Sequence, residues 1–223
     1  MVEMIIAIDG PAGAGKSTIA KLVAKALGYV YLDTGAMYRA LTLKAIEQNI
    51  SSNDISRIIE LAKTSVIDLS NNADGSLTVR LDNRDVTNFI RQPRITKMVS
   101  DIAKIKEVRE QMVMVQRRLG EQKDSVLDGR DIGTVVFPHA QKKFFLDALF
   151  SERVNRRFEE LKQIGNQISR EEVHQDLLNR DTIDSTRTVA PLKKADDAIY
   201  IDTTNMSIEE VVATLLKHIV SHG

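Results

Sequence analysis

The residues whose chemistry is clearest form one glycine-rich run near the amino terminus, Gly10-Pro11-Ala12-Gly13-Ala14-Gly15-Lys16-Ser17. The run matches the pattern G-x-x-x-x-G-K-S in full, in which backbone N–H groups and the start of a helix surround phosphate oxygens. Lys16 would reach the β- and γ-phosphates of a nucleoside triphosphate, and the Ser17 hydroxyl would hold Mg²⁺. A glycine-rich turn that binds nothing is the alternative, but an apolar strand pattern precedes the run and a helical pattern follows it. The expected nucleotide-binding residues are Gly10, Pro11, Ala12, Gly13, Ala14, Gly15, Lys16, Ser17 and Thr18.

Two further segments place arginines directly after predicted strands. Thr34 and Arg39 follow the second apolar run, and both suit an acceptor phosphate, Arg39 as a two-pronged donor. Asp128 and Arg130 follow the third run, at the carboxyl end of a strand, where open α/β sheets bind ligands. There Asp128 would orient Mg²⁺ through water and Arg130 would bind phosphate. A solvated Arg39 and an internal ion pair between Asp128 and Arg130 are the alternatives.

Three more arginines, Arg153, Arg156 and Arg157, lie on one helical stretch, Ser151–Lys162. Their spacings of three and four residues put Arg153 near both of the others on one helix face. Glutamates occur among them, so a solvated, salt-bridged helix explains these arginines about as well as a phosphate site does. The histidines fall in no motif, and we interpret all four as surface residues: His139, His174, His218 and His222.

A phosphate-binding loop by itself indicates only a nucleoside triphosphate. The guanine-reading tetrapeptide Asn-Lys-x-Asp does not occur in the chain, which argues against a GTPase switch. Polymer-moving ATPases are usually larger. A short chain with many further arginines instead favours a kinase of a small anionic acceptor, because such a transfer brings many negative charges together.

The elements that must position these residues alternate between short apolar runs and longer helical patterns. That alternation predicts an α/β fold with a five-stranded parallel sheet flanked by helices. The five expected strands are Met4–Asp9, Tyr29–Leu32, Ser125–Leu127, Lys143–Leu146 and Ala198–Ile201. The helix Ser17–Leu27 follows the glycine-rich run, with Gly28 at the position of a C-terminal cap.

The middle of the chain departs from this alternation. Ser65–Leu69 and Leu77–Leu81 predict two strands of a hairpin, joined through a cluster of turn-forming residues. Apolar residues at helical spacing then predict one long helix over Ile95–Leu119. Ser169-Arg170-Glu171-Glu172 fits a capping box that opens another helix, and Ser207–Ile219 predicts the last one.

Composition narrows the function further. The 223 residues include 31 Lys or Arg and 31 Asp or Glu, and only 4% are aromatic, so we expect no nucleic-acid partner. The absence of cysteine excludes disulfides, cysteine-ligated metal centres and thiol nucleophiles. No apolar run is long enough to cross a bilayer, so we expect a cytoplasmic protein without a membrane partner. We also expect the protein to act as a monomer.

Four segments in this order resemble bacterial cytidylate (CMP/dCMP) kinases of the P-loop nucleoside monophosphate kinase family. They are residues 10–18, 33–39, 128–138 and 187–192. The resemblance covers nearly the whole chain and implies a single P-loop kinase domain over 1–223. Its core would be 1–34, 120–149 and 166–223, with a small β-containing insertion for the nucleoside monophosphate (NMP) over about 35–119. A short helical lid would span about Phe150–Gly165.

The resemblance also implies roles for individual residues, with ATP as phosphoryl donor, CMP or dCMP as acceptor and Mg²⁺ as cofactor. The expected catalytic residues are Lys16, Arg130, Asp128, Arg153 and Arg157. The acceptor phosphate would be bound by Thr34, Arg39, Arg130 and Arg187, the ribose by Arg180 and Asp184, and cytosine by Ser100, Arg109 and Asp131. Asp131 or Ser100 would accept from the cytosine N4 amino group, and Arg109 would donate to N3 or O2.

Two other functions remain open at this point. The first is a P-loop kinase for another monophosphate such as UMP, against which a carboxylate facing N4 argues. The second is a nucleotide-gated binding protein that hydrolyses slowly, against which the missing guanine motif and the arginine-rich lid argue. ATP turnover with and without CMP separates them.

Overall fold

The computed structural model describes residues 3–163, 165 and 167–220. Parts of several predictions lie outside the described residues: residues 1–2 of the first core segment, Ile164 of the expected lid, and residues 166 and 221–223 of the last core segment, which include His222. Among the described helices none is both long and apolar enough to cross a bilayer.

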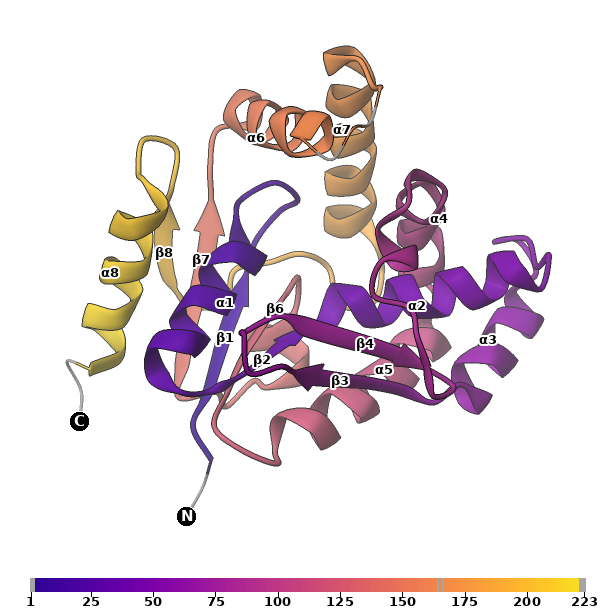
Figure 1. Ribbon diagram of the computed structural model, residues 1–223, viewed down its shortest axis with the longest axis horizontal. Coiled ribbons are helices and arrows are strands. Elements are labelled where there is room, and N and C mark those ends of the chain that lie inside the picture. Colours follow the sequence, from indigo (N-terminus) through magenta and orange to yellow (C-terminus); the bar gives the residue numbers. More distant parts are fainter. Residues whose placement is uncertain (1–2, 164, 166, 221–223) are drawn as a thin grey trace.

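The centre of the molecule is a five-stranded parallel sheet, as the alternation of apolar runs predicts (Figure 1). Its strand order is β2-β6-β1-β7-β8. The strands are β1 (Ile5–Asp9), β2 (Val30–Asp33), β6 (Ser125–Gly129), β7 (Lys142–Asp147) and β8 (Ile199–Asp202). Each lies within two residues of its predicted bounds. The central strands β1 and β6 are buried along their whole length, which is why their sequences are mostly apolar.

Helices cover both faces of this sheet, and β1 shows how. Ile6 and Ile8 pack into one apolar cluster with residues of α1 (Lys16–Leu27) and α8 (Ile208–Val220). Ile5 and Ala7 point to the opposite face and join a second cluster, which includes residues of α2 (Thr34–Glu47) and α5 (Lys106–Gly120). Alternate residues of one strand therefore serve two cores.

The segment inserted between β2 and β6 contributes most residues of the second cluster. It contains α3 (Ile55–Thr64), the antiparallel strands β3 (Ile67–Asn71), β4 (Leu77–Leu81) and β5 (Arg84–Asp85), the short 3₁₀ helix η1 (Phe89–Arg91), and α4 (Pro93–Ala103). The predicted hairpin is β3–β4. Its first strand begins two residues later than predicted, and the two-residue β5 had no pattern of its own to predict it.

The prediction of one long helix over Ile95–Leu119 is wrong. The chain forms two helices, α4 and α5, and Ile105 between them is extended, with ψ 123°. Ile102 before the break and Val108 after it pack into the same apolar cluster, so the spacing of apolar residues continues across the break. Periodicity therefore could not reveal the break.

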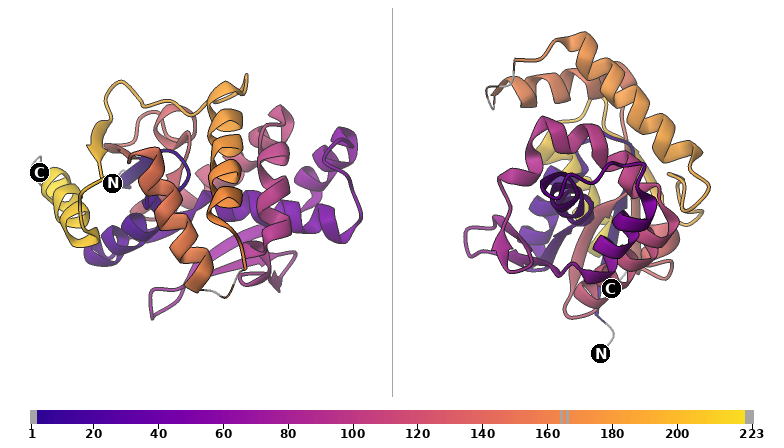
Figure 2. Two further views of the ribbon diagram at one scale, coloured as in Figure 1. Left: turned by 90° about the horizontal axis from the view of Figure 1, so that it is seen from above. Right: turned by 90° about the vertical axis from the view of Figure 1, so that its right-hand side faces the viewer.

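Two helices, α6 (Phe150–Gln163) and α7 (Arg170–Thr186), form a separate layer across the carboxyl ends of the strands (Figures 1 and 2). The predicted capping box at the start of α7 is present: Ser169 Oγ accepts from Glu172 N, and the Glu172 carboxylate accepts from Ser169 N. This layer has its own small apolar cluster, which includes Val154, Leu161 and Leu177 together with Ala12 of the glycine-rich loop.

Candidate active site

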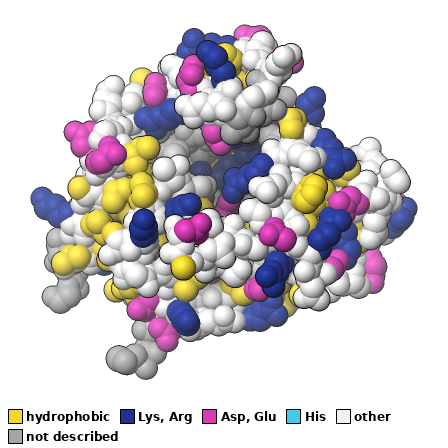
Figure 3. Space-filling model, in the orientation of Figure 1, with side chains coloured by type: hydrophobic (Ala, Val, Ile, Leu, Met, Phe, Trp, Pro, Cys, Tyr) yellow, Lys and Arg dark blue, Asp and Glu magenta, His cyan; other side chains and the backbone are white. Residues whose placement is uncertain are grey.

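A cavity of about 260 Å³ lies between the carboxyl ends of the strands and the layer formed by α6 and α7. The glycine-rich loop, the residues that follow β2 and β6, and side chains of α4, α5, α6 and α7 line it. In the space-filling view this part of the surface is hollowed, and Lys and Arg side chains gather in the hollow (Figure 3). Such a position is where open α/β sheets bind ligands.

The glycine-rich loop connects β1 to α1, as the motif requires. A side chain at Gly10 would lie 1.9 Å from the carbonyl oxygen of Leu146 on the neighbouring strand, so only glycine fits. Gly13 has φ 78°, and a side chain there would press against Arg153 of α6 at 3.0 Å. Both positions therefore need glycine for close packing. Gly13 and Gly15 line the cavity, so the loop exposes its backbone to a ligand there.

Lys16 begins α1 and is 5% exposed. Its ammonium group donates to the Pro11 carbonyl of the same loop at 2.6 Å. Burial, and secondly the positive charge of Arg130, lower the pKa of Lys16 to about 7. The lowered pKa means that the nearby negative charges do not fully stabilise the protonated lysine, and the phosphates of a bound nucleotide would do so.

Asp128, at the end of β6, is the centre of a hydrogen-bond network. Its carboxylate accepts from Ser17 Oγ at 2.7 Å and from the Tyr31 hydroxyl at 2.9 Å. Thr34 Oγ1 donates to the Asp128 carbonyl at 2.7 Å. Burial and the nearby Asp33 raise the pKa of Asp128 to about 6. Tyr31 was missed by the sequence reasoning, because in a short apolar run its ring is indistinguishable from a core residue.

Hydroxyl and carboxylate oxygens are the ligands that Mg²⁺ prefers. Ser17 and Asp128 supply one of each beside the loop, so the residues fit a nucleotide-bound Mg²⁺. Across the described ranges no three His, Cys, Asp or Glu side chains are grouped closely enough to hold a metal ion by themselves.

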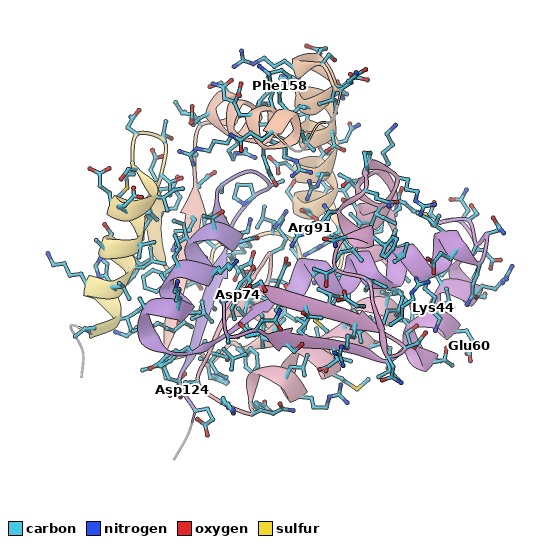
Figure 4. The ribbon with its side chains drawn as sticks, viewed as in Figure 1. Lys44, Glu60, Asp74, Arg91, Asp124 and Phe158 are labelled. Atoms are coloured by element: carbon cyan, nitrogen blue, oxygen red, sulfur yellow. The ribbon has the colours of Figure 1, made fainter. Side chains whose placement is uncertain are left out.

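Positive charge crowds the middle of the cavity. Arg39 donates to Thr96 Oγ1 at 2.9 Å, and burial together with the charges of Arg180 and Arg91 lowers its pKa to about 9. Arg91, from the insertion, donates to Asp33 Oδ2 at 2.8 Å while 54% of its side chain stays exposed. It lies near the centre of the view below α7 (Figure 4). No spacing in the sequence singled out Arg91.

Arg130, Asp184 and Arg187 form a buried chain of charges on the α7 side of the cavity. Arg130 Nε donates to Asp184 Oδ2 at 2.8 Å, and Arg187 Nη1 lies 3.4 Å from Asp184 Oδ1. Burial acts against ionisation, but these two guanidinium groups hold the pKa of Asp184 below its usual value. Arg180, one turn earlier on α7, lines the same cavity. The structure thus brings these predicted residues together.

The far end of the cavity contains the residues expected to read a base. Ser100, Arg109 and Asp131 all line it. Arg109 and Asp131 form a buried ion pair, and Arg187 Nη2 lies 3.8 Å from the second oxygen of Asp131. The guanidinium of Arg109 lies 5.4 Å from the centre of the Tyr38 ring. The sequence predicted these residues as separate contacts, whereas the fold pairs two of them.

The side chains of the three arginines of α6 have different surroundings, although helical spacing predicted that Arg153 would lie near both of the others. Arg157 lines the cavity and pairs with Glu160 at 2.8 Å. Arg156 Nη2 donates to the Thr203 carbonyl at 2.6 Å, beside a second cavity that the glycine-rich loop also lines.

Arg153 lines neither of these two cavities. Its guanidinium donates to the Ala12 carbonyl at 2.9 Å and to Asp181 at 2.5 Å, so it fastens α6 and α7 to the glycine-rich loop. The structure therefore places Arg153 behind the loop and outside the two cavities, and its contact with phosphate stays a prediction. Its spacing from Arg157 gave no warning, because the loop carbonyl that binds Arg153 is distant in sequence.

A phosphate-binding loop that shares one cavity with a cluster of arginines defines a P-loop phosphotransferase of the nucleoside monophosphate kinase type. The comparisons with known proteins then give the family. The cytidylate kinase family model matches residues 6–221, and the chain therefore belongs to the cytidylate kinase family.

Individual relatives agree with the family match. A cytidylate kinase of Caldicellulosiruptor saccharolyticus is 51% identical over 217 residues, which are 97% of this chain and 96% of that protein. One of Caldanaerobacter subterraneus subsp. tengcongensis is 53% identical over 214 residues, 96% of this chain and 93% of that protein. A solved structure of an uncharacterized protein from Eubacterium ventriosum has a TM-score of 0.53 at 15% identity, with 99% of each chain covered, and shares the fold.

Proposed function

We propose that the chain transfers the terminal phosphoryl group of ATP to CMP or dCMP, forming CDP or dCDP and ADP, as a monomeric cytoplasmic enzyme that uses Mg²⁺. The observation that carries this proposal is the single cavity that joins Lys16 to the arginine cluster and to the Arg109–Asp131 pair. Membership of the cytidylate kinase family supports the same acceptor. Residues of this one chain line the cavity on all the elements named above, which supports a monomer.

On the donor side, the loop N–H groups and Lys16 would hold the β- and γ-phosphates of ATP. Ser17 would hold Mg²⁺, with Asp128 behind it, and the ion would neutralise charge on the phosphates. The base of ATP would occupy the second cavity, between Arg156 and the start of α8. Lys16 would stabilise the charge that moves during transfer, since its amino group already lies against the loop and would be protonated beside the phosphates.

On the acceptor side, Thr34, Arg39 and Arg130 would bind the monophosphate, and Arg187 would lie within reach of it. Arg91 joins this set, because its half-exposed guanidinium lines the same part of the cavity. Arg91 and Arg130 are each paired with a carboxylate, but burial and neighbouring guanidinium groups still lower the pKa of Arg39, and a bound phosphate would relieve that cost. Positioning two phosphates in line supplies most of the catalysis in such enzymes.

The base would lie at the far end, against the Arg109–Asp131 pair and Ser100. An ionised carboxylate has about four acceptor positions, so Asp131 can pair with Arg109 and still accept from the N4 amino group of cytosine. Uracil has an oxygen at that position, which would face the carboxylate. Asp184 pairs with Arg130 and with Arg187, which in turn lies near Asp131, so Asp184 lies between the phosphate and base ends, where the ribose would be. Arg180 lines the same cavity one turn away and would join it at the ribose.

We propose the following division of the chain. Residues 35–119 carry the acceptor-binding insertion, residues 150–165 form the lid, and the remaining segments form the core. The insertion contributes Arg39, Arg91 and Arg109 to the cavity, and the lid contributes Arg157. This supports a mechanism in which both parts close on the nucleotides and exclude water.

A coupled assay of ADP release tests the proposal, run with CMP, dCMP, UMP, AMP and GMP in turn. We expect the highest kcat/KM with CMP or dCMP, and at least about tenfold less with UMP. Equal or better turnover with another monophosphate would reject the assigned acceptor. ATP hydrolysis that does not change on addition of CMP would instead indicate a nucleotide-gated binding protein.

A further inference from the structure

Asp131 lines the cavity and is also the residue that precedes a short helix. It stands at the N-cap of the short helix η2 (Ile132–Val136), where an aspartate commonly accepts from the first free N–H groups of the helix. Its carboxylate makes no such bond and pairs with Arg109 and Arg187 instead. The first N–H groups of η2 therefore need another acceptor.

Asp9 supplies that acceptor from a different strand. It is the last residue of β1, directly before the glycine-rich loop, and is 4% exposed. Its Oδ1 accepts from Ile132 N at 2.8 Å, and its Oδ2 accepts from Gly133 N at 2.7 Å. Both oxygens are used as acceptors, which a carboxylate can do and an amide cannot.

Gly133 lies close to both the Asp9 carboxylate and the Lys143 side chain. A side chain at Gly133 would lie 3.1 Å from Lys143 Cδ and 3.4 Å from Asp9 Oδ2. Burial raises the pKa of Asp9 to about 7, against the effect of the two N–H groups that favour its ionised form. A buried carboxylate at this position is costly, and its two bonds to η2 offset that cost.

We propose that Asp9 is a positioning residue for base selection: it caps η2 in place of Asp131, and so leaves the Asp131 carboxylate free to pair with Arg109 and meet the base. This inference rests on the proposed function. It also joins the two halves of the site, since Asp9 precedes Gly10 of the donor loop and fixes the segment that follows Arg130 on the acceptor side. Without the cap, Asp131 would turn back to its own helix.

Asp9→Asn tests the inference, because asparagine keeps the shape of the side chain and one acceptor but turns an NH₂ group toward an N–H. We expect amide exchange at Ile132 and Gly133 to become about tenfold faster, as expected for a lost cap. We expect kcat/KM for CMP to fall about tenfold and that for UMP much less, so that the preference for CMP shrinks. The KM for ATP should change less than about twofold.

Ile8→Val is the matched control. Ile8 lies next to Asp9 in the same strand and is fully buried, but it packs into the cluster with α1 and α8, on the other side from η2. It should lower the melting temperature without changing the ratio of CMP to UMP turnover. Equal losses with both nucleotides in Asp9→Asn, with unchanged exchange at Ile132 and Gly133, would overturn the inference.

Asp9→Ala provides a second route if Asp9→Asn does not fold, because alanine removes both acceptor oxygens and adds no bulk. We expect the same loss of preference for CMP, and an unchanged ratio would overturn the inference. The wild-type protein separates this test from the proposed function. If the wild type shows no preference for CMP, the proposed acceptor is wrong, whereas exchange at Ile132 and Gly133 still reports on the cap.

Discussion

Binding of ATP should change the protonation of Lys16, and the structure gives the size of the change. The lysine is buried beside Arg130, and its pKa lies at about 7 without nucleotide. At pH 8, about one unit above that value, only about one lysine in ten carries its proton. Phosphates in the loop would bring several negative charges into contact with Lys16 and restore its ordinary basicity. Each ATP bound at pH 8 should therefore take up close to one proton.

Titration calorimetry of ATP without acceptor, in buffers with different ionisation enthalpies, measures this uptake. The observed enthalpy should vary with the ionisation enthalpy of the buffer, with a slope of about 0.9 proton at pH 8. The sign follows from the lowered pKa: uptake by Lys16 shrinks as the pH falls toward 6, because the free lysine is then mostly protonated. Lys16→Met removes this contribution, and the difference between the two proteins isolates it. A wild-type slope near zero, or one equal to that of Lys16→Met, would refute the reasoning.

Four further predictions concern individual residues and segments. Lys16→Met should keep the fold, as judged by circular dichroism, and lose most turnover; near-normal kcat would contradict the assignment of the loop. Asp131→Ala should reduce kcat/KM for CMP much more than for UMP and also lower the melting temperature, because Arg109 is left buried without its partner; an unchanged CMP-to-UMP ratio would count against base reading by Asp131. Arg153→Met should destabilise the protein by about 2 kcal/mol and raise the KM for ATP more than that for CMP, because it frees the Ala12 end of the loop; an effect on CMP alone would show that Arg153 acts elsewhere. In the free protein, amides of α6 should exchange faster than those of β1 and β6, because α6 packs into a small separate cluster; equal protection would argue against a lid that opens.

Local chemistry made much of the fold and site predictable. The glycine-rich run carries its own context of strand and helix, so the sequence alone was enough to assign residues 10–18 to a phosphate-binding loop. The five core strands could be predicted because each contains a short apolar run, which is longest in the buried strand β1. Thr34 and Arg130 directly follow strands, Asp128 lies near the end of β6, and Arg39 lies in the helix after β2; parallel strands bring these ends to one edge of the sheet.

The features that the sequence did not reveal had either no local signal or a partner distant in sequence. Ile105 is buried like its helical neighbours, so nothing local marks the break between α4 and α5. Arg153 binds a loop carbonyl 141 residues away, which its spacing from Arg157 cannot indicate. Tyr31 belongs to the site because its hydroxyl donates to Asp128, which is 97 residues away in sequence. The pairing of Arg109 with Asp131 joins α5 to the end of β6 in the same way.

Analysis of the products tests the central claim most directly. The purified protein is mixed with Mg²⁺, ATP and CMP, and the phosphorus nuclear magnetic resonance spectrum is followed until ATP is consumed. Transfer to the acceptor predicts that CDP and ADP appear in equal amounts, that inorganic phosphate stays at the level of the enzyme-free control, and that omission of CMP stops the loss of ATP. Formation of ADP and inorganic phosphate without CDP would contradict the claim.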